Sequence, residues 1–86
     1  MKAEWDDASS DALADIWVAA TPEERDEIER AVLRANRLLT DDPENEGESR
    51  GGNDRVLIVT PLTVWYRVRP GPRAVVFNVR RARPRP

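Results

Sequence analysis

Apolar residues recur at steps of three and four along two stretches in the first half of the chain. The first stretch carries Ala12, Leu13, Ile16, Trp17 and Ala20, and the second carries Ile28, Ala31, Val32, Ala35, Leu38 and Leu39. This spacing places each set on one face of an α-helix. It predicts two amphipathic helices, over about Ala8–Ala20 and Pro22–Leu39, and it assigns Trp17 to the core rather than to ligand stacking.

Capping residues mark the ends of both predicted helices. Asp6 or Asp7 can cap the first helix. Thr21, followed by a proline and then by Glu24 at the third position, forms a capping box that starts the second helix. The segment Asp41–Pro43 ends it. The tight corner between the two helices predicts a helical hairpin.

Apolar and polar residues alternate in the second half of the chain, after a polar loop over 44–54. The alternation predicts three strands, Arg55–Thr60, Leu62–Arg69 and Arg73–Arg81. Lys2–Trp5 alternates as well and predicts a short edge strand. Short connections make the main strands antiparallel neighbours. The predicted fold is a single α+β domain over 1–86, in which a helical hairpin packs on a three- to four-stranded antiparallel sheet.

The same alternation divides the predicted sheet into two faces. The wholly apolar sets are Leu62, Val64, Tyr66 and Val68 on one strand and Val75, Phe77 and Val79 on the next. These sets are expected beneath the helices, so Tyr66 is not expected to act as a catalyst. The residues left on the opposite face, toward solvent, include Trp65, Arg67, Asn78 and Arg80.

An aromatic ring among arginines on an open sheet is typical of a nucleic-acid surface, because guanidinium groups pair with phosphates and bases stack on indole. Two other interpretations stay open. Arginine stems can cover an otherwise bare tryptophan on a solvated face, or the face or an edge of the sheet can receive another polypeptide. The basic tail over 81–86 is likewise either an anchor for an acidic partner or an ordinary solubilising terminus.

The amino-acid composition limits the catalytic and metal-binding groups that the chain can provide. The 86 residues include no cysteine and no histidine, which excludes thiolate chemistry, a histidine general base and a His/Cys metal site. No cofactor or metal is expected. The longest apolar run, Val56–Val59, is far too short to span a bilayer, and no secretory signal precedes the first helix. We therefore expect a cytoplasmic protein without a membrane partner.

The net charge of −2 conceals a strong asymmetry between the two halves of the chain. Residues 1–49 carry five basic side chains against fifteen acidic ones, a net charge of −10. Residues 50–86 carry nine arginines against Asp54 alone, a net charge of +8. Such a split indicates either a charged partner or two halves that neutralise each other within one domain.

The order of the predicted elements resembles the RelE/ParE family of bacterial toxins over nearly the whole chain. The residues that carry the resemblance are Trp5, Leu13, Ile16–Trp17, Leu38–Leu39, Asp42–Pro43, Gly47, Arg55–Leu57, Pro61–Val68 and Val75–Val79. The resemblance implies the toxin of a type II toxin–antitoxin pair, held inactive by an acidic antitoxin. RelE-like members cut mRNA on the ribosome, whereas ParE-like members share the fold and act on DNA gyrase without being nucleases.

The resemblance and the open face together suggest three groups of functional residues. Cleavage would use the cations of Arg67, Arg80 and Arg81 to stabilise a phosphorane. RNA or another target would be bound by Arg55, Trp65, Arg67, Asn78, Arg80 and Arg83. The antitoxin would contact Arg81, Arg83 and Arg85.

The sequence departs from the nuclease pattern in several places. Thr63 stands where many nucleases carry an arginine, Ala82 stands where they carry a histidine or arginine, and no tyrosine follows the last strand. Arg81 and Arg83 flank Ala82, so a slip of a single position restores that match. Arginine itself stays protonated and is a poor general base. Ribosome-dependent mRNA cleavage is the first hypothesis, a gyrase inhibitor the second and an inactive interaction module the third.

Overall fold

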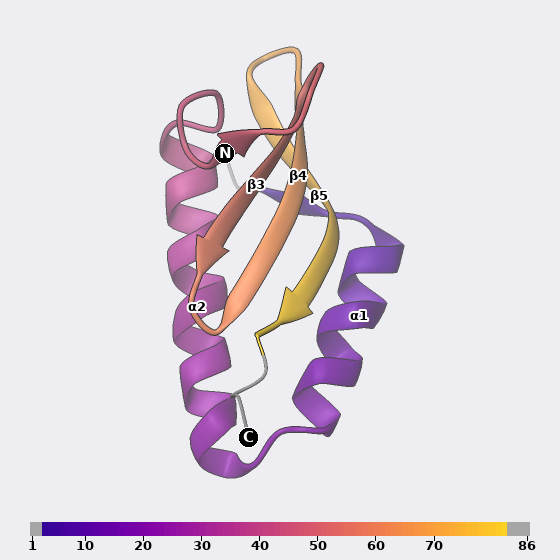
Figure 1. Cartoon of the computed structure of the whole chain (residues 1–86), viewed down its shortest axis with the longest axis vertical. Helices are drawn as coiled ribbons and strands as arrows, with labels where there is room; N and C mark the ends of the chain where they lie inside the picture. The colour runs from indigo at the N-terminus through magenta and orange to yellow at the C-terminus, as the bar shows by residue number, and fades with distance from the viewer. Residues whose placement is uncertain (1–2, 83–86) are drawn as a thin grey trace.

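The computed structural model describes residues 3–82, in which two helices pack on a five-stranded sheet (Figure 1). In chain order the elements are β1 (Glu4–Trp5), α1 (Asp7–Val18), α2 (Pro22–Asp41), β2 (Glu48–Ser49), β3 (Asp54–Val59), β4 (Leu62–Arg69) and β5 (Arg73–Arg81). The predicted α+β class is confirmed. The sheet has more strands than predicted, because the short strand β2 forms within the segment 44–54 that the sequence suggests is a loop.

Capping side chains set where the two helices begin. Asp6 accepts a hydrogen bond from Ser9 N at 2.8 Å, so the first of the two candidate aspartates is the cap of α1. The capping box of α2 is confirmed: Thr21 Oγ1 accepts from Glu24 N at 3.2 Å, and Glu24 Oε1 accepts from Thr21 N at 2.8 Å. Among the described residues, neither helix combines the length and the apolar character needed to cross a membrane.

The sheet has the strand order β1-β5-β4-β3-β2. The short strand β1 runs parallel to β5, and every other neighbouring pair is antiparallel. Figure 1 shows α1 on the side of β5 and α2 beside β3, with the helices joined at one end of the molecule. The strands β1 and β5 therefore lie side by side, while β3 lies near the opposite border of the sheet.

The core forms where α2 and the helix side of the sheet meet. Its buried apolar side chains are Ala20, Ile28, Ala31, Ala35, Leu39, Leu57, Val59, Leu62, Val64, Tyr66, Ala74, Val76 and Val79. From α1, residues such as Leu13 and Ile16 pack against this core but are only partly buried. Trp17 was expected in the core, yet it is 38% exposed and Arg25 lies over its ring at 5.6 Å.

The last strand turns different side chains toward the helices from those that its alternation predicts. The alternation assigns Val75, Phe77 and Val79 to the helix side. The structure instead buries Ala74, Val76 and Val79 there, and leaves the other two half-buried on the opposite side of the sheet. The prediction is therefore wrong for Val75 and Phe77.

A β-bulge explains the change of face. Trp65 pairs with Asn78, but the next residue, Tyr66, pairs with Val76. Phe77 is the extra residue between these two pairs, so the alternation of β5 shifts by one position there. The strand β4 has no such insertion, and its buried positions follow the predicted alternation.

Candidate functional site

The side of the sheet turned away from the helices, called the open face below, gathers the aromatic and basic residues of β4 and β5. Residues directly opposite each other on neighbouring strands share a face. Thr63 lies opposite Arg80, Trp65 opposite Asn78 and Arg67 opposite Val75, and Phe77 joins them at the bulge. The structure thus brings together four predicted site residues, Trp65, Arg67, Asn78 and Arg80.

Arg80 and Trp65 form a cation–aromatic pair on the open face. The Arg80 guanidinium lies 5.9 Å from the centre of the Trp65 ring, within the range of a cation–π contact. Arg80 is exposed, and no ion pair or side-chain hydrogen bond involves it in the described part of the chain. A cation is therefore held above an aromatic ring and is available for an anionic ligand.

Arg67 has two partners on the same face. Its guanidinium lies 5.4 Å from the centre of the Phe77 ring. It also pairs with Asp54, with Nε–Oδ1 at 2.7 Å. The hydrogen bond from Arg67 lowers the pKa of the Asp54 carboxyl, and the same contact raises the pKa of Arg67. Its positive charge is largely offset by the carboxylate.

A shallow hollow of about 260 Å³ continues the open face toward β1. It is lined by Glu4 and Asp6 together with Arg67, Arg69 and Arg73 and the apolar side chains of Val75 and Phe77. Arg73 pairs with Glu4, with Nη1–Oε1 at 2.7 Å. This end carries both signs of charge, including Arg69, which makes no ion pair within residues 3–82, whereas the Arg80 end carries a cation without an ion-pair partner.

The structure does not bring Arg81 to the open face. Arg81 lies opposite Leu62, on the helix side of the sheet, and its guanidinium pairs with Glu24 in the first turn of α2. The hydrogen bonds from Thr21 and Arg81 lower the pKa of the Glu24 carboxyl. Arg81 Nε is buried and has no hydrogen-bond partner among residues 3–82. Arg81 therefore forms a structural ion pair that links β5 to α2.

Arg55 also lies on the helix side of the sheet, opposite Tyr66. Its Nε donates to the carbonyl oxygen of Glu46 at 2.9 Å and its Nη2 to that of Gly47 at 2.7 Å. The Tyr66 hydroxyl donates to the carbonyl oxygen of Pro43 at 2.8 Å and also lies against that of Glu46. Burial raises the pKa of Tyr66. These contacts hold the loop before β2 against the sheet.

Sequence reasoning missed Phe77 and Asp54 as members of the open face. Nothing local to Phe77 signals the bulge, because the shift depends on pairing with β4. Asp54 did carry a signal, since it is the only acidic residue after position 49. The predicted residues Arg83 and Arg85 lie outside the described residues.

The open face has no features of a metal site. Within residues 3–82, no three acidic, histidine or cysteine side chains gather closely enough to hold a metal ion. Of the carboxylates at the open face, Asp54 and Glu4 are each paired with an arginine, and Asp6 caps α1. The chemistry that these side chains support is the binding of a phosphate or another anion and the stacking of a ring.

No family model matches the chain, and no curated protein matches it. The resemblance to RelE/ParE toxins stays a prediction from the sequence.

Proposed function

We propose that this chain is the toxin of a type II toxin–antitoxin pair that acts in the cytoplasm and inhibits translation by cutting ribosome-bound mRNA. The observation that carries the proposal is the pairing of Arg80 with Trp65 on the open face, at 5.9 Å from cation to ring centre. An exposed guanidinium can bind a phosphate in two-point fashion. An unpaired base can stack on the indole when the Arg80 side chain moves from the ring to a phosphate.

The neighbouring residues support single-stranded RNA over a folded duplex. Asn78 lies opposite Trp65, where its amide can reach a base edge, and Thr63 lies opposite Arg80. Sequence-tolerant stacking combined with cationic contacts is how sheets and related surfaces bind single strands. The ribosome would present the mRNA in that unpaired form.

The chemistry of the open face is electrostatic. Attack of a ribose 2′-hydroxyl on the adjacent phosphate builds negative charge on a phosphorane, which arginine can stabilise. In this proposal Arg80 supplies that charge, and Arg67 becomes a second cation when a phosphate displaces Asp54. The 2′-hydroxyl loses its proton to solvent, since arginine stays protonated. The P–O5′ bond breaks to leave a 2′,3′-cyclic phosphate, and the leaving 5′-oxygen takes a proton from water.

Induced expression in bacteria tests this proposal, with incorporation of labelled methionine and labelled thymidine followed separately. Methionine incorporation is expected to fall first, and an Arg80→Ala/Trp65→Ala double variant should abolish the fall. Arg37→Ala is the matched control, because Arg37 is exposed on α2, away from the sheet face. Continued methionine incorporation after induction would contradict the translational target.

A second candidate function, a ParE-like inhibitor of DNA gyrase that works by binding, is favoured by a specific observation. Of the three candidate catalytic arginines, Arg67 pairs with Asp54 and Arg81 pairs with Glu24, which leaves Arg80 alone. The sequence also has no histidine to act as a base. A fall in thymidine incorporation before methionine would support this function, and no effect on either would indicate an inactive interaction module.

The proposed antitoxin is acidic and contacts the basic tail and the open face. Because Arg81 is held by Glu24, the tail contact is assigned to Arg83 and Arg85. An Arg83→Ala/Arg85→Ala variant is expected to bind a purified antitoxin, encoded in a neighbouring reading frame, more weakly. An unchanged dissociation constant would count against the tail as part of that contact.

A further inference from the structure

The outer edge of β3 is only partly covered by another strand. β2 pairs with β3 at two positions, Glu48 opposite Val56 and Ser49 opposite Arg55. Within the described part of the chain, no strand pairs with residues 57–59 on that side. Backbone groups alternate in direction along a strand, and Arg50 N donates to the Asp54 carbonyl oxygen on the β2 side of β3. The outward N–H and C=O of this stretch are therefore those of Ile58, and they form a short sheet edge to which a further strand can add.

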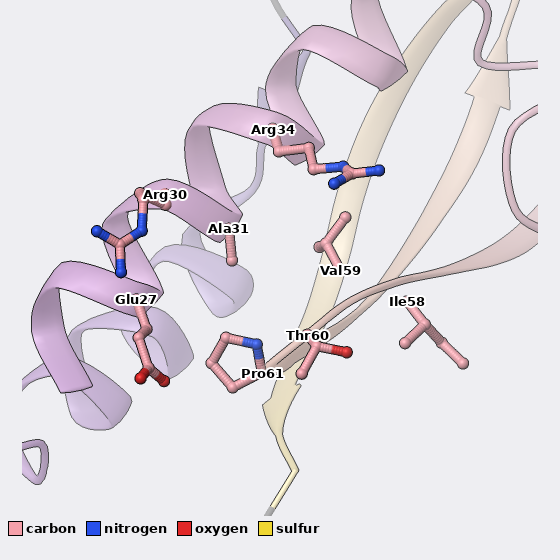
Figure 2. A pocket seen from close by; sticks show the side chains of 8 residues that line it. All are labelled: Glu27, Arg30, Ala31, Arg34, Ile58, Val59, Thr60 and Pro61. Carbon is pink, nitrogen blue, oxygen red and sulfur yellow. The ribbon is translucent and has the colours of Figure 1, made fainter.

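A pocket of about 580 Å³ lies alongside this edge, between β3 and α2 (Figure 2). From α2 it is lined by Arg30 and Arg34, with Glu27 nearer the start of the helix. Figure 2 shows Arg34 reaching from the helix toward Val59, whereas Ile58 points away from the helix. An added strand would thus meet the arginines on one of its faces only.

The charge in the pocket favours an anionic occupant. Arg30 and Arg34 are exposed, and neither takes part in an ion pair within residues 3–82. The helical rise of about 1.5 Å per residue places Glu27 roughly 10 Å along the axis from Arg34. The single carboxylate therefore does not neutralise the Arg34 end.

The other side of the edge is apolar. Ile58 is 71% exposed, one of the most exposed large apolar side chains among the described residues. Natural sheet edges are usually protected by a charged side chain, a proline or a bulge. No such protection lies within 57–59, so this stretch is suited to an apolar side chain of a partner strand.

We propose that the edge of β3 binds an extended acidic segment of another polypeptide, which adds to the sheet as a strand beside residues 57–59. Residues of the added strand opposite Leu57 and Val59 lie on the helix side, where carboxylates can pair with Arg30 and Arg34. The residue between them lies beside Ile58 and is apolar. The partner segment therefore alternates acidic and apolar residues.

A second copy of this chain fits the edge less well. A symmetric contact places the same patch on both partners, so it would bring Arg30 and Arg34 of the two copies to one interface. An acidic strand removes that repulsion. Ile58 shares the open face with Trp65, but the outward backbone of β3 and the arginines of α2 are not part of the Arg80–Trp65 pair. The inference goes beyond the proposed function without depending on it.

A peptide titration of the full chain tests this site. The probes are a short synthetic peptide that alternates glutamate with valine and a counterpart with lysine in place of glutamate. Affinity is measured by fluorescence anisotropy, and amide signals of the ¹⁵N-labelled chain are followed by NMR. The acidic peptide is expected to bind and the lysine peptide is not. Amide shifts should concentrate at 57–59, with slowed exchange at the outward amide of Ile58.

Two variants of α2 locate the contact. Arg30→Ala/Arg34→Ala is expected to weaken binding of the acidic peptide by about tenfold or more, as the loss of two charge-assisted contacts implies. Arg37→Ala, on an exposed position that does not line the pocket, should leave it unchanged. The proposal would be overturned if both peptides bound with equal affinity or if the double variant left binding unchanged. Amide shifts centred on β5, or no binding at about millimolar peptide, would also overturn it.

Discussion

Arg67 and Asp54 form a two-point ion pair across β4 and β3, with Nε–Oδ1 at 2.7 Å and Nη2–Oδ2 at 3.2 Å. Asp54 thus binds the Arg67 guanidinium, which the sequence suggests is available for RNA. An RNA phosphate must compete with Asp54 for Arg67, whereas Arg80 has no carboxylate competitor within residues 3–82. The two arginines are therefore expected to contribute unequally to binding.

Removing the Asp54 charge should strengthen RNA binding. Asp54→Asn keeps the shape of the side chain but frees Arg67, so affinity for a single-stranded RNA oligonucleotide is expected to rise by about two- to fivefold at low salt. Arg80→Ala should instead weaken binding and reduce the salt dependence by about 0.7 in the log–log slope. Anisotropy titrations over a range of salt concentrations measure both effects.

The effect of Asp54→Asn on affinity shows whether Arg67 contacts the RNA. Equal behaviour of Asp54→Asn and the unaltered chain would show that Arg67 does not reach the RNA. A control with Arg37→Ala, far from the open face on α2, is expected to leave both affinity and slope unchanged.

Acidification should destabilise the fold through two carboxyl groups. Hydrogen bonds from Thr21 and Arg81 lower the pKa of Glu24, and Arg67 lowers that of Asp54. A carboxyl with a lowered pKa stabilises the folded state above its unfolded pKa, about 4, and this stabilisation is lost as pH falls through the folded value. Urea unfolding at a series of pH values below about 5 should show a shallower decline for Glu24→Gln and for Asp54→Asn.

Gly47 is expected to tolerate no side chain. Its φ is +67°, and a Cβ there would lie 2.4 Å from the carbonyl oxygen of Val56. Gly47→Ala should lower the free energy of unfolding by roughly 2–4 kcal/mol, through both backbone strain and the clash. Gly51→Ala is the matched control, with φ +98° but nothing within 4 Å of the added carbon. If the two variants lost the same free energy of unfolding in urea, the close approach of residue 47 to β3 would not contribute to the loss.

The Tyr66 hydroxyl is expected to stabilise the loop that precedes β2. Tyr66→Phe leaves the Pro43 carbonyl without its 2.8 Å partner, which should cost about 1–2 kcal/mol in the free energy of unfolding. Because burial raises the pKa of Tyr66, its neutral form stabilises the fold below pH 10 and this contribution is lost as pH rises further. The variant should lack that alkaline loss, and thermal melts between about pH 8 and pH 11 test it.

Signals between neighbours in the sequence predicted much of the fold. The capping box of Thr21 and Glu24 starts α2 where expected, and the limits of β4 and β5 match the predicted strands. These features depend on hydrogen bonds or alternation within a few residues, so the chain carries them without reference to any distant partner. They also sufficed to predict Trp65 and Arg80 on one face.

Contacts between distant segments decided the rest of the candidate site. The bulge at Phe77 arises from the pairing of two strands and moved two apolar side chains to the open face. Arg55 and Arg81, chemically identical to Arg80 in the sequence, are turned to the helix side and bound by carbonyl groups or by Glu24.

The sequence by itself thus determined the elements, their order and the alternation of β4, because each rests on local hydrogen bonding and periodicity. Only the tertiary structure decided which arginines are free, which are paired and which edge of the sheet is left uncovered. The physical reason is that a charge is offset, and a backbone edge is covered, only by groups that folding brings near, and here those groups lie far apart along the chain.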